Sequence, residues 1–189
     1  ADIIEYRMQR ETFVTRGVST KLPTHFGEFT LIEYNSPVDP EPHLALCCGG
    51  LGTLDANGEP IVHEEPVLVR VESECMTGHV FHSLRCDCGQ QLDAAMHMIQ
   101  AAGLLQELVQ NFGDARAKAH AIKEVEHQGD LVTHELVKRL NTTFITPIDR
   151  EDIHELATRL DDVLDYMEAA AERLVVYRIK EPTSACRAM

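Results

Sequence analysis

The stretch from residue 66 to residue 102, PVLVRVESECMTGHVFHSLRCDCGQQLDAAMHMIQAA, decides the fold expected for the first half of the chain. Its β-branched start, PVLVRVESEC, predicts a buried strand that ends at Cys75. Its end, from Gln90 onward, predicts an amphipathic helix, because apolar residues recur there every three or four positions. These positions are Leu92, Ala95, Met96, Ile99 and Ala102. A cysteine-rich segment therefore connects a strand to a helix, as in an α/β fold.

Two segments before this stretch predict further strands. Residues 22–34, LPTHFGEFTLIEY, begin with a Pro-Thr turn and continue with alternating apolar residues, among them Phe29 and Leu31. Residues 43–48 predict a second strand. The following run, GGLGTLDANGEP, is rich in Gly, Asn, Asp and Pro and predicts loop and turn.

After Gly103 the sequence predicts only helices, up to about residue 178. The first apolar stripe consists of Ile122, Val125, Gly129, Val132, Leu136 and Leu140. The second consists of Ile153, Leu156, Leu160, Val163, Met167, Ala170 and Leu174. Pro147 in the connecting NTTFITP prevents the first helix from continuing, and Asp149 with Asp152 predicts the N-cap of the second. The expected fold class is α+β, an incomplete α/β half followed by an all-α antiparallel helical hairpin.

Charge and composition limit the partners of the chain. The formal net charge of −14 repels phosphate backbones, so nucleic acid is not an expected partner. The hydrophobic share of 44% and the charged share of 25% are typical of soluble globular proteins. No apolar stretch approaches the roughly 20 residues that cross a bilayer, and the start, ADIIEYRMQRE, lacks the pattern of a signal peptide. We therefore expect a cytoplasmic protein.

Three cysteines form the pattern C-x10-C-x-C at Cys75, Cys86 and Cys88. Three thiolates can hold a zinc ion and leave its fourth tetrahedral position to water, as in catalytic zinc sites. His79 and His82 lie within the same loop and could instead close the site. Spacing alone leaves open whether a metal binds. The other cysteines, at positions 47, 48 and 186, are expected to be buried or incidental.

The stretch RVESECMTGHVFHSLRCDCGQQLDAA resembles the zinc motif of GTP cyclohydrolase II. LPTHFGEF resembles the start of the same domain. ADIIEYRMQRE resembles the end of the dihydroxybutanone-phosphate synthase that precedes this domain in bifunctional riboflavin biosynthesis enzymes. The resemblance implies a synthase-like tail over residues 1–21 and the first half of a cyclohydrolase domain over residues 22–103.

This resemblance implies an activity and a set of site residues. Cyclohydrolases of this family open the imidazole ring of GTP and release formate and pyrophosphate, with Zn²⁺ as the cofactor. The zinc ligands would be Cys75, Cys86 and Cys88. The residues contacting GTP would be Arg70, Val71, Glu72, Ser73, Glu74 and Gln91.

The chain also departs from the cyclohydrolase pattern. Glu72 stands where a His is common, and His79 stands where an Asp is common. After residue 103 the family continues with a nucleotide-binding loop and a catalytic Asp and Arg, which this sequence replaces with LLQELVQNFGDARAKAH. We therefore expect zinc binding without turnover of GTP. No catalytic residue can be assigned from the sequence.

Two acidic pairs lie beside the apolar stripes of the expected hairpin. Glu126 and Asp130 are four residues apart on one helix, and so are Asp161 and Asp165 on the other. The hairpin would bring them to one level, where four carboxylates could hold a hard cation, iron or manganese. The alternative is that these carboxylates lie on solvated helix faces.

The stretch KEVEHQGDLVTHELVKRLNTTFITPIDREDIHELATRLDDVLDYMEAAAERLVVYRI resembles PhoU-like proteins that accompany phosphate transporters. The resemblance covers residues 104 to about 183 and makes 104–189 a PhoU-like hairpin. It implies metal binding at the acidic pairs and a membrane phosphate transporter as partner. The broad apolar face of the hairpin predicts a homo-oligomer. Both resemblances end at residues 103 and 104, so the chain is expected to be a chimera, whether a natural fusion, an assembly artefact or a constructed one.

Overall fold

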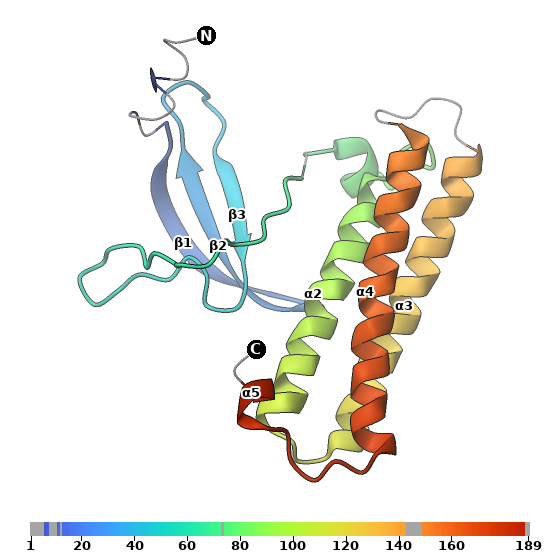
Figure 1. Ribbon diagram of the computed structural model, residues 1–189. Helices are drawn as coiled ribbons and strands as arrows, with labels where there is room; N and C mark the ends of the chain where they lie inside the picture. The colour runs from blue at the N-terminus through green and yellow to red at the C-terminus, as the bar shows by residue number, and fades with distance from the viewer. Residues whose placement is uncertain (1–5, 8–10, 12, 73, 143–148, 188–189) are drawn as a thin grey trace. The chain divides into compact units, whose positions relative to one another are not determined.

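The computed structural model describes residues 6–7, 11, 13–72, 74–142 and 149–187. Its architecture is α+β, with a small antiparallel sheet and several helices (Figure 1). The chain divides into two compact units, Ala1–Val69 and Arg70–Met189. The sheet lies in the first unit and the long helices lie in the second.

The first unit contains three antiparallel strands in the order β1-β2-β3. They are β1 (Thr15–Thr24), β2 (Gly27–Asn35) and β3 (His43–Cys47). A tight turn joins β1 to β2, where the Thr24 hydroxyl donates a hydrogen bond to the Gly27 carbonyl at 2.9 Å. Gly27 has a φ of 133°, a backbone conformation open chiefly to glycine. Phe29 and Ile32 on β2 are the buried apolar residues of this sheet.

The strand predictions are confirmed only in part. The segment 43–48 forms β3, and most of 22–34 forms β2. The prediction missed β1, whose register with β2 runs from Thr15 opposite Asn35 to Thr24 opposite Gly27. Few apolar residues mark β1, and most of its residues are exposed, so its sequence carries little of the alternation that signals a half-buried strand.

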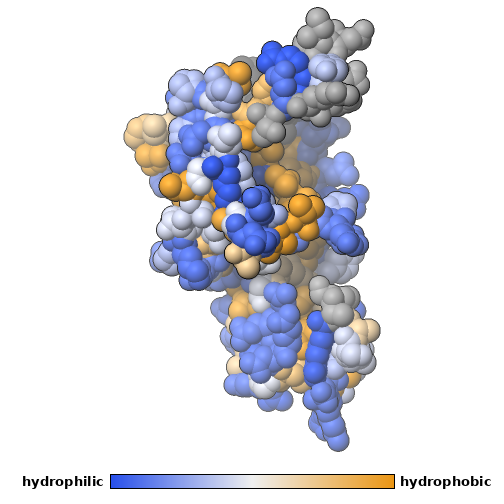
Figure 2. All heavy atoms as spheres, turned by 90° about the vertical axis from the view of Figure 1, so that its left-hand side faces the viewer, coloured by the Kyte–Doolittle hydropathy of each residue, from blue (hydrophilic) through white to orange (hydrophobic). Residues whose placement is uncertain are grey.

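The prediction of a buried strand over residues 66–75 is wrong. In the part of the chain that the structure describes, this segment forms no strand, and Leu68 and Val71 are 93% and 91% exposed. β-branched residues favour a strand mainly through packing against neighbouring strands, and the described strands pair only among β1, β2 and β3, with one isolated bridge between Leu54 and Pro60. Figure 2 shows apolar side chains (orange) at the surface among polar ones (blue).

The second unit is built on three long helices that lie side by side (Figure 1). They are α2 (Cys88–Gln110), α3 (Ala115–Thr142) and α4 (Arg150–Val176), with a short α5 (Ser184–Arg187) near the end. Each pair among the three long helices is in contact. The prediction of a helix from Gln90 is confirmed, and α2 runs on without a break through residues 103 and 104.

Helix α2 covers the apolar face of α3 and α4. Ala101 of α2 packs with Val125 and Leu164, and Leu108 packs with Ile122 and Ala171. The sequence predicted a hairpin of α3 and α4 alone, and therefore self-association to cover this face. The unit is instead a three-helix bundle with its core inside one chain, and self-association stays a prediction.

The buried face of α4 differs from the predicted stripe. The buried residues are Ile153, Ala157, Leu164 and Ala171. Leu156 and Val163, which the stripe included, are 46% and 42% exposed. On α2, likewise, Ala101 is buried whereas the predicted Ala102 is exposed. The apolar surface of these helices is broad, and the packing of the neighbouring helices decides which part of it is buried.

The predicted start of the last long helix is confirmed. The Asp149 carboxylate accepts a hydrogen bond from the Glu151 amide at 2.9 Å, as an N-cap does. Pro147 and most of the connecting NTTFITP lie outside the described residues. Among the helices that are described, none combines the length and the apolar character needed to span a membrane.

Candidate metal centre

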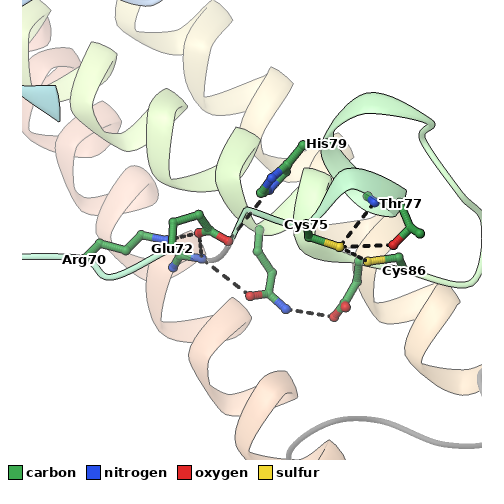
Figure 3. Close-up of polar contacts among 9 residues, drawn as sticks. Arg70, Glu72, Cys75, Thr77, His79 and Cys86 are labelled. Carbon is green, nitrogen blue, oxygen red and sulfur yellow. Dashed lines mark hydrogen bonds and ion pairs between the residues drawn. The ribbon is translucent and has the colours of Figure 1, made fainter. Parts of the chain in front are cut away.

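Three cysteine side chains converge at the start of α2. Cys75 precedes a single π-helical turn, η1 (Met76–Val80), Cys86 lies in the following loop, and Cys88 is the first residue of α2. Their sulfur atoms all lie within 4.8 Å of one another, with Cys75 and Cys86 3.3 Å apart (Figure 3). Zn–S bonds of about 2.3 Å in a tetrahedral site place sulfur atoms about 3.8 Å apart. The three thiols therefore fit a zinc ion.

Two glycines allow the η1 turn to lie against the cysteine loop. A Cβ on Gly78 would lie 2.9 Å from the Cys86 sulfur and 3.0 Å from Cys88 Cβ. A Cβ on Gly89 would lie 3.1 Å from the Gly78 carbonyl oxygen. Only a residue without a side chain fits such approaches without displacing its neighbours, so the glycines are part of the local design of the cluster.

Local hydrogen bonds favour the thiolate form of Cys75. The Thr77 hydroxyl lies 3.1 Å from its sulfur, and the Gly78 amide donates to the same atom at 3.4 Å. Together with Cys86, these contacts lower the pKa of Cys75 to about 6. A metal ligand must be deprotonated, so Cys75 is prepared for that role.

Burial has the opposite effect on Cys88. Its pKa is raised to about 12, first by burial and then by the neighbouring thiols of Cys86 and Cys75. Three thiolates at this separation repel one another when no cation lies between them. The cluster thus favours a bound cation, which compensates the negative charge of all three.

Neither histidine of the loop belongs to the cluster. In the described part of the chain, the three cysteines are the only group of at least three Cys, His, Asp or Glu side chains close enough to share a metal ion. The His79 ring points toward Glu72, whose carboxylate lies 3.8 Å from His79 Nε2 (Figure 3). His82 is exposed. The described residues therefore leave the fourth position of a tetrahedral site to water or substrate.

A chain of polar contacts lies beside the cluster (Figure 3). The Arg70 guanidinium donates to the Glu72 carboxylate at 2.9 Å and to the Gln91 side-chain oxygen at 3.5 Å. The Gln91 amide nitrogen in turn donates to the Asp87 carboxylate at 2.8 Å. Three of the expected GTP contacts, Arg70, Glu72 and Gln91, are thus brought together next to the cysteines.

The other expected GTP contacts are not in this chain of contacts. Val71 and Glu74 are exposed, and Ser73 lies outside the described residues. With Val71 and Glu74 facing solvent, these two side chains do not join Arg70, Glu72 and Gln91 in one ligand site.

One residue that contacts the cysteine loop was not predicted from the sequence. Arg139, near the end of α3, donates from Nη1 to the Cys86 carbonyl oxygen at 3.4 Å. The two residues are 53 positions apart, and no local spacing pattern connects them. The contact arises because α3 packs against α2.

The expected second metal site lies between α3 and α4. Burial raises the pKa of Glu126, and so do the charges of Asp165, Glu168 and Asp130. Burial also raises the pKa of Asp161, with Asp165 and Asp130 adding to the effect and a hydrogen bond with Thr133 opposing it. The carboxylates of the two helices are therefore close enough to repel one another. They do not form a group of the tightness seen for the cysteines, and metal binding there stays a prediction.

Comparison with known proteins places the chain in a family. The model of the family GTP cyclohydrolase II matches residues 15–144, which is more than half of the chain. The chain belongs to the GTP cyclohydrolase II family. Its match to the family model extends beyond residue 103, where we expected the resemblance to end, and the boundary at residues 103 and 104 stays a prediction.

Several relatives of this cyclohydrolase family member are riboflavin biosynthesis proteins. It is 49% identical over 102 residues to the riboflavin biosynthesis protein RibBA of Bacillus cytotoxicus and to that of Bacillus mycoides. It is 48% identical over 103 residues to RibBA of Rhodococcus jostii. Each match covers 54% of this chain and 23% of the relative. The chain thus spans about a quarter of the length of the relatives it matches.

Proposed function

We propose that this chain binds one zinc ion through Cys75, Cys86 and Cys88. It would correspond to the zinc-binding part of a GTP cyclohydrolase II of riboflavin biosynthesis. The observation that carries the proposal is the convergence of three sulfur atoms within 4.8 Å, with no fourth ligand from the described residues. A site of this kind suits catalytic zinc, whereas structural zinc takes four protein ligands. GTP is the substrate class that the family implies.

The bound zinc would act as a Lewis acid and lower the pKa of a water molecule in its fourth position. The chain's own residues supply orientation. Arg70 suits a phosphate oxygen or a polarised carbonyl, because its guanidinium presents several donors in a fixed plane. Glu72 holds that guanidinium in place, and Gln91 offers an amide that can both donate to and accept from a purine edge.

We further propose that the chain, as it stands, does not turn over GTP. The cavity lined by Arg70, Gln91 and residues of α3 and α4 has a volume of about 30 Å³. Pockets for small-molecule ligands are typically on the order of 300–1,000 Å³. The neighbouring segment also presents Val71 to solvent, where a substrate pocket would need a wall.

The test is elemental analysis of the purified chain and of Cys86→Ala, followed by a formate assay with GTP on the same samples. We expect one zinc ion per chain in the parent, less than about a tenth of that in Cys86→Ala, and no formate above a Cys75→Ala control. A zinc content in Cys86→Ala equal to that of the parent would refute the metal site. Formate release well above the Cys75→Ala control would refute the loss of turnover.

A second candidate function, metal binding in a PhoU-like regulator of phosphate transport, rests on the sequence resemblance, and the acidic pairs would be its metal site. Burial is the largest cause that raises the pKa of Glu126 and of Asp161, and the charges of Asp165 and Asp130, respectively, add to it from the neighbouring helix. A cation between the helices would relieve this repulsion. Iron or manganese that is retained by the parent and lost in Asp130→Ala would support this function, and identical metal contents in both would count against it.

A further inference from the structure

Arg139 ties the cysteine loop to two helices. Its Nε donates to the Glu135 carboxylate one turn earlier on α3, at 3.1 Å. Its Nη1 donates to the Cys86 carbonyl at 3.4 Å. With the Gln90 amide oxygen turned toward the guanidinium, that oxygen accepts from Nη1 at 2.9 Å and from Nη2 at 3.1 Å. One planar group thus holds α3, the metal-site loop and the first turn of α2.

The contact falls where two proposed ligands meet. Cys86 and Cys88 are separated by a single residue, Asp87, which precedes α2 as its N-cap residue. The carbonyl that accepts from Arg139 belongs to Cys86 itself. A shift of this carbonyl turns the Cys86 peptide unit and moves its sulfur relative to that of Cys88.

The Arg139 guanidinium is largely shielded from solvent. Only 17% of the Arg139 side chain is exposed, and hydrogen bonds strengthen when solvent is excluded from them. Three thiolates around a divalent cation also carry a net negative charge, which the nearby guanidinium offsets. Both the geometry and the charge of Arg139 therefore favour the loaded site.

We propose that Arg139 is a positioning residue for the three-cysteine site, and that zinc affinity depends on its fork of hydrogen bonds to Cys86 and Gln90. This inference rests on the proposed zinc binding. It assigns part of the metal site to α3, beyond the cysteine motif itself. Outer partners of metal ligands typically change metal affinity by about 10–100-fold when removed.

The experiment is a zinc titration against a competing chelator for the parent, Arg139→Ala and Arg139→Lys, with melting of the zinc-free forms measured in parallel. The expected result is a Kd for zinc raised about 10-fold or more in Arg139→Ala. Arg139→Lys should rescue little, because an ammonium group keeps the charge but cannot make the planar fork. Arg159→Ala is the matched control, since Arg159 makes the same type of pair with Glu155 on α4 at 3.4 Å.

Each outcome decides between the claims. A parent that binds no zinc refutes the proposed function itself. A parent that binds zinc with a Kd unchanged within twofold in Arg139→Ala overturns only the role of Arg139, as does an equal loss in Arg159→Ala. If Arg139→Ala does not fold, Gln90→Ala removes the second acceptor while keeping the arginine. An unchanged zinc Kd in that variant, or full rescue by Arg139→Lys, also overturns the proposal.

Discussion

The Cys75 and Cys86 sulfur atoms lie 3.3 Å apart although eleven positions separate the two residues in the chain. The η1 turn with Gly78, packed against Gly89 of α2, allows this approach. The hydrogen bonds that favour the Cys75 thiolate come from the same turn. The close approach of these sulfur atoms thus arises within a segment of fifteen residues, from Cys75 to Gly89.

Replacing His79 with alanine is expected to leave zinc binding nearly unchanged. Its ring points toward Glu72 and does not belong to the cysteine group. The Kd for zinc in a chelator competition should stay within about threefold of the parent, whereas Cys88→Ala should weaken binding by at least about 100-fold, because it removes a direct ligand. A loss in His79→Ala comparable to that in Cys88→Ala would make His79 the fourth ligand.

Gly78→Ala is expected to raise the Kd for zinc by about 10-fold or more. The added methyl group would lie 2.9 Å from the Cys86 sulfur, a distance that forces the loop or the η1 turn to move. Gly103→Ala is the control, because its Cβ would meet no atom within 4 Å. An unchanged zinc affinity in Gly78→Ala would show that the cluster tolerates this displacement.

Gly129→Ala and Gly103→Ala should change stability in opposite directions. Both glycines lie within helices, where alanine is favoured by about 1 kcal/mol. A Cβ at Gly129 collides with the buried Leu164 side chain, and overpacking of this kind costs about 1–3 kcal/mol. The free energy of unfolding, measured by urea denaturation, should therefore fall for Gly129→Ala and rise for Gly103→Ala. A rise in both would mean that the space between α3 and α4 is larger than the structure gives.

Glu126→Gln is expected to stabilise the bundle at neutral pH and not at low pH. Burial, Asp165 and Glu168 raise the pKa of Glu126, so the folded chain binds this proton more tightly than the unfolded chain does. The stabilising contribution of the protonated form is complete below about pH 4 and is lost as pH rises through the folded pKa. The free energy of unfolding at pH 7 should rise by about 0.5 kcal/mol in the amide variant, since solvent partly screens the repulsion.

Thermal melting at pH 7 and pH 3.5 measures this difference. Glu124→Gln is the control, because Glu124 lies on the same helix with a side chain that is 61% exposed. A destabilised Glu126→Gln at pH 7 would contradict the repulsion and would instead favour a cation held by these carboxylates.

The sequence predicted those features that depend on local spacing. The cysteine cluster and the N-cap at Asp149 follow from residues close together in the chain, and the structure has both. The apolar stripe of α3 is also confirmed, with Ile122, Val125 and Leu136 buried. A helix fixes which residues share a face, so such stripes need no knowledge of the rest of the fold.

The features that were missed depend on partners distant in the chain. The strand expected at residues 66–75 needs a strand to pair with, and the strands that the structure describes pair only with one another. The packing of α2 and α3 against α4 determines which face of α4 is buried. For this reason Ala157 is buried while Leu156 is half exposed. The contact of Arg139 with Cys86 likewise exists only because α3 packs against α2.

Helix α2 begins at a proposed zinc ligand, Cys88, and carries Leu108 in the bundle core near its other end. Its 23 residues span about 34 Å. A cation bound at the first turn opposes fraying of the helix that the core depends on, so ligand binding and bundle unfolding are thermodynamically linked. The melting temperature of the bundle would then rise with the free zinc concentration, so the stability of the helices would report how much of the site is occupied by metal.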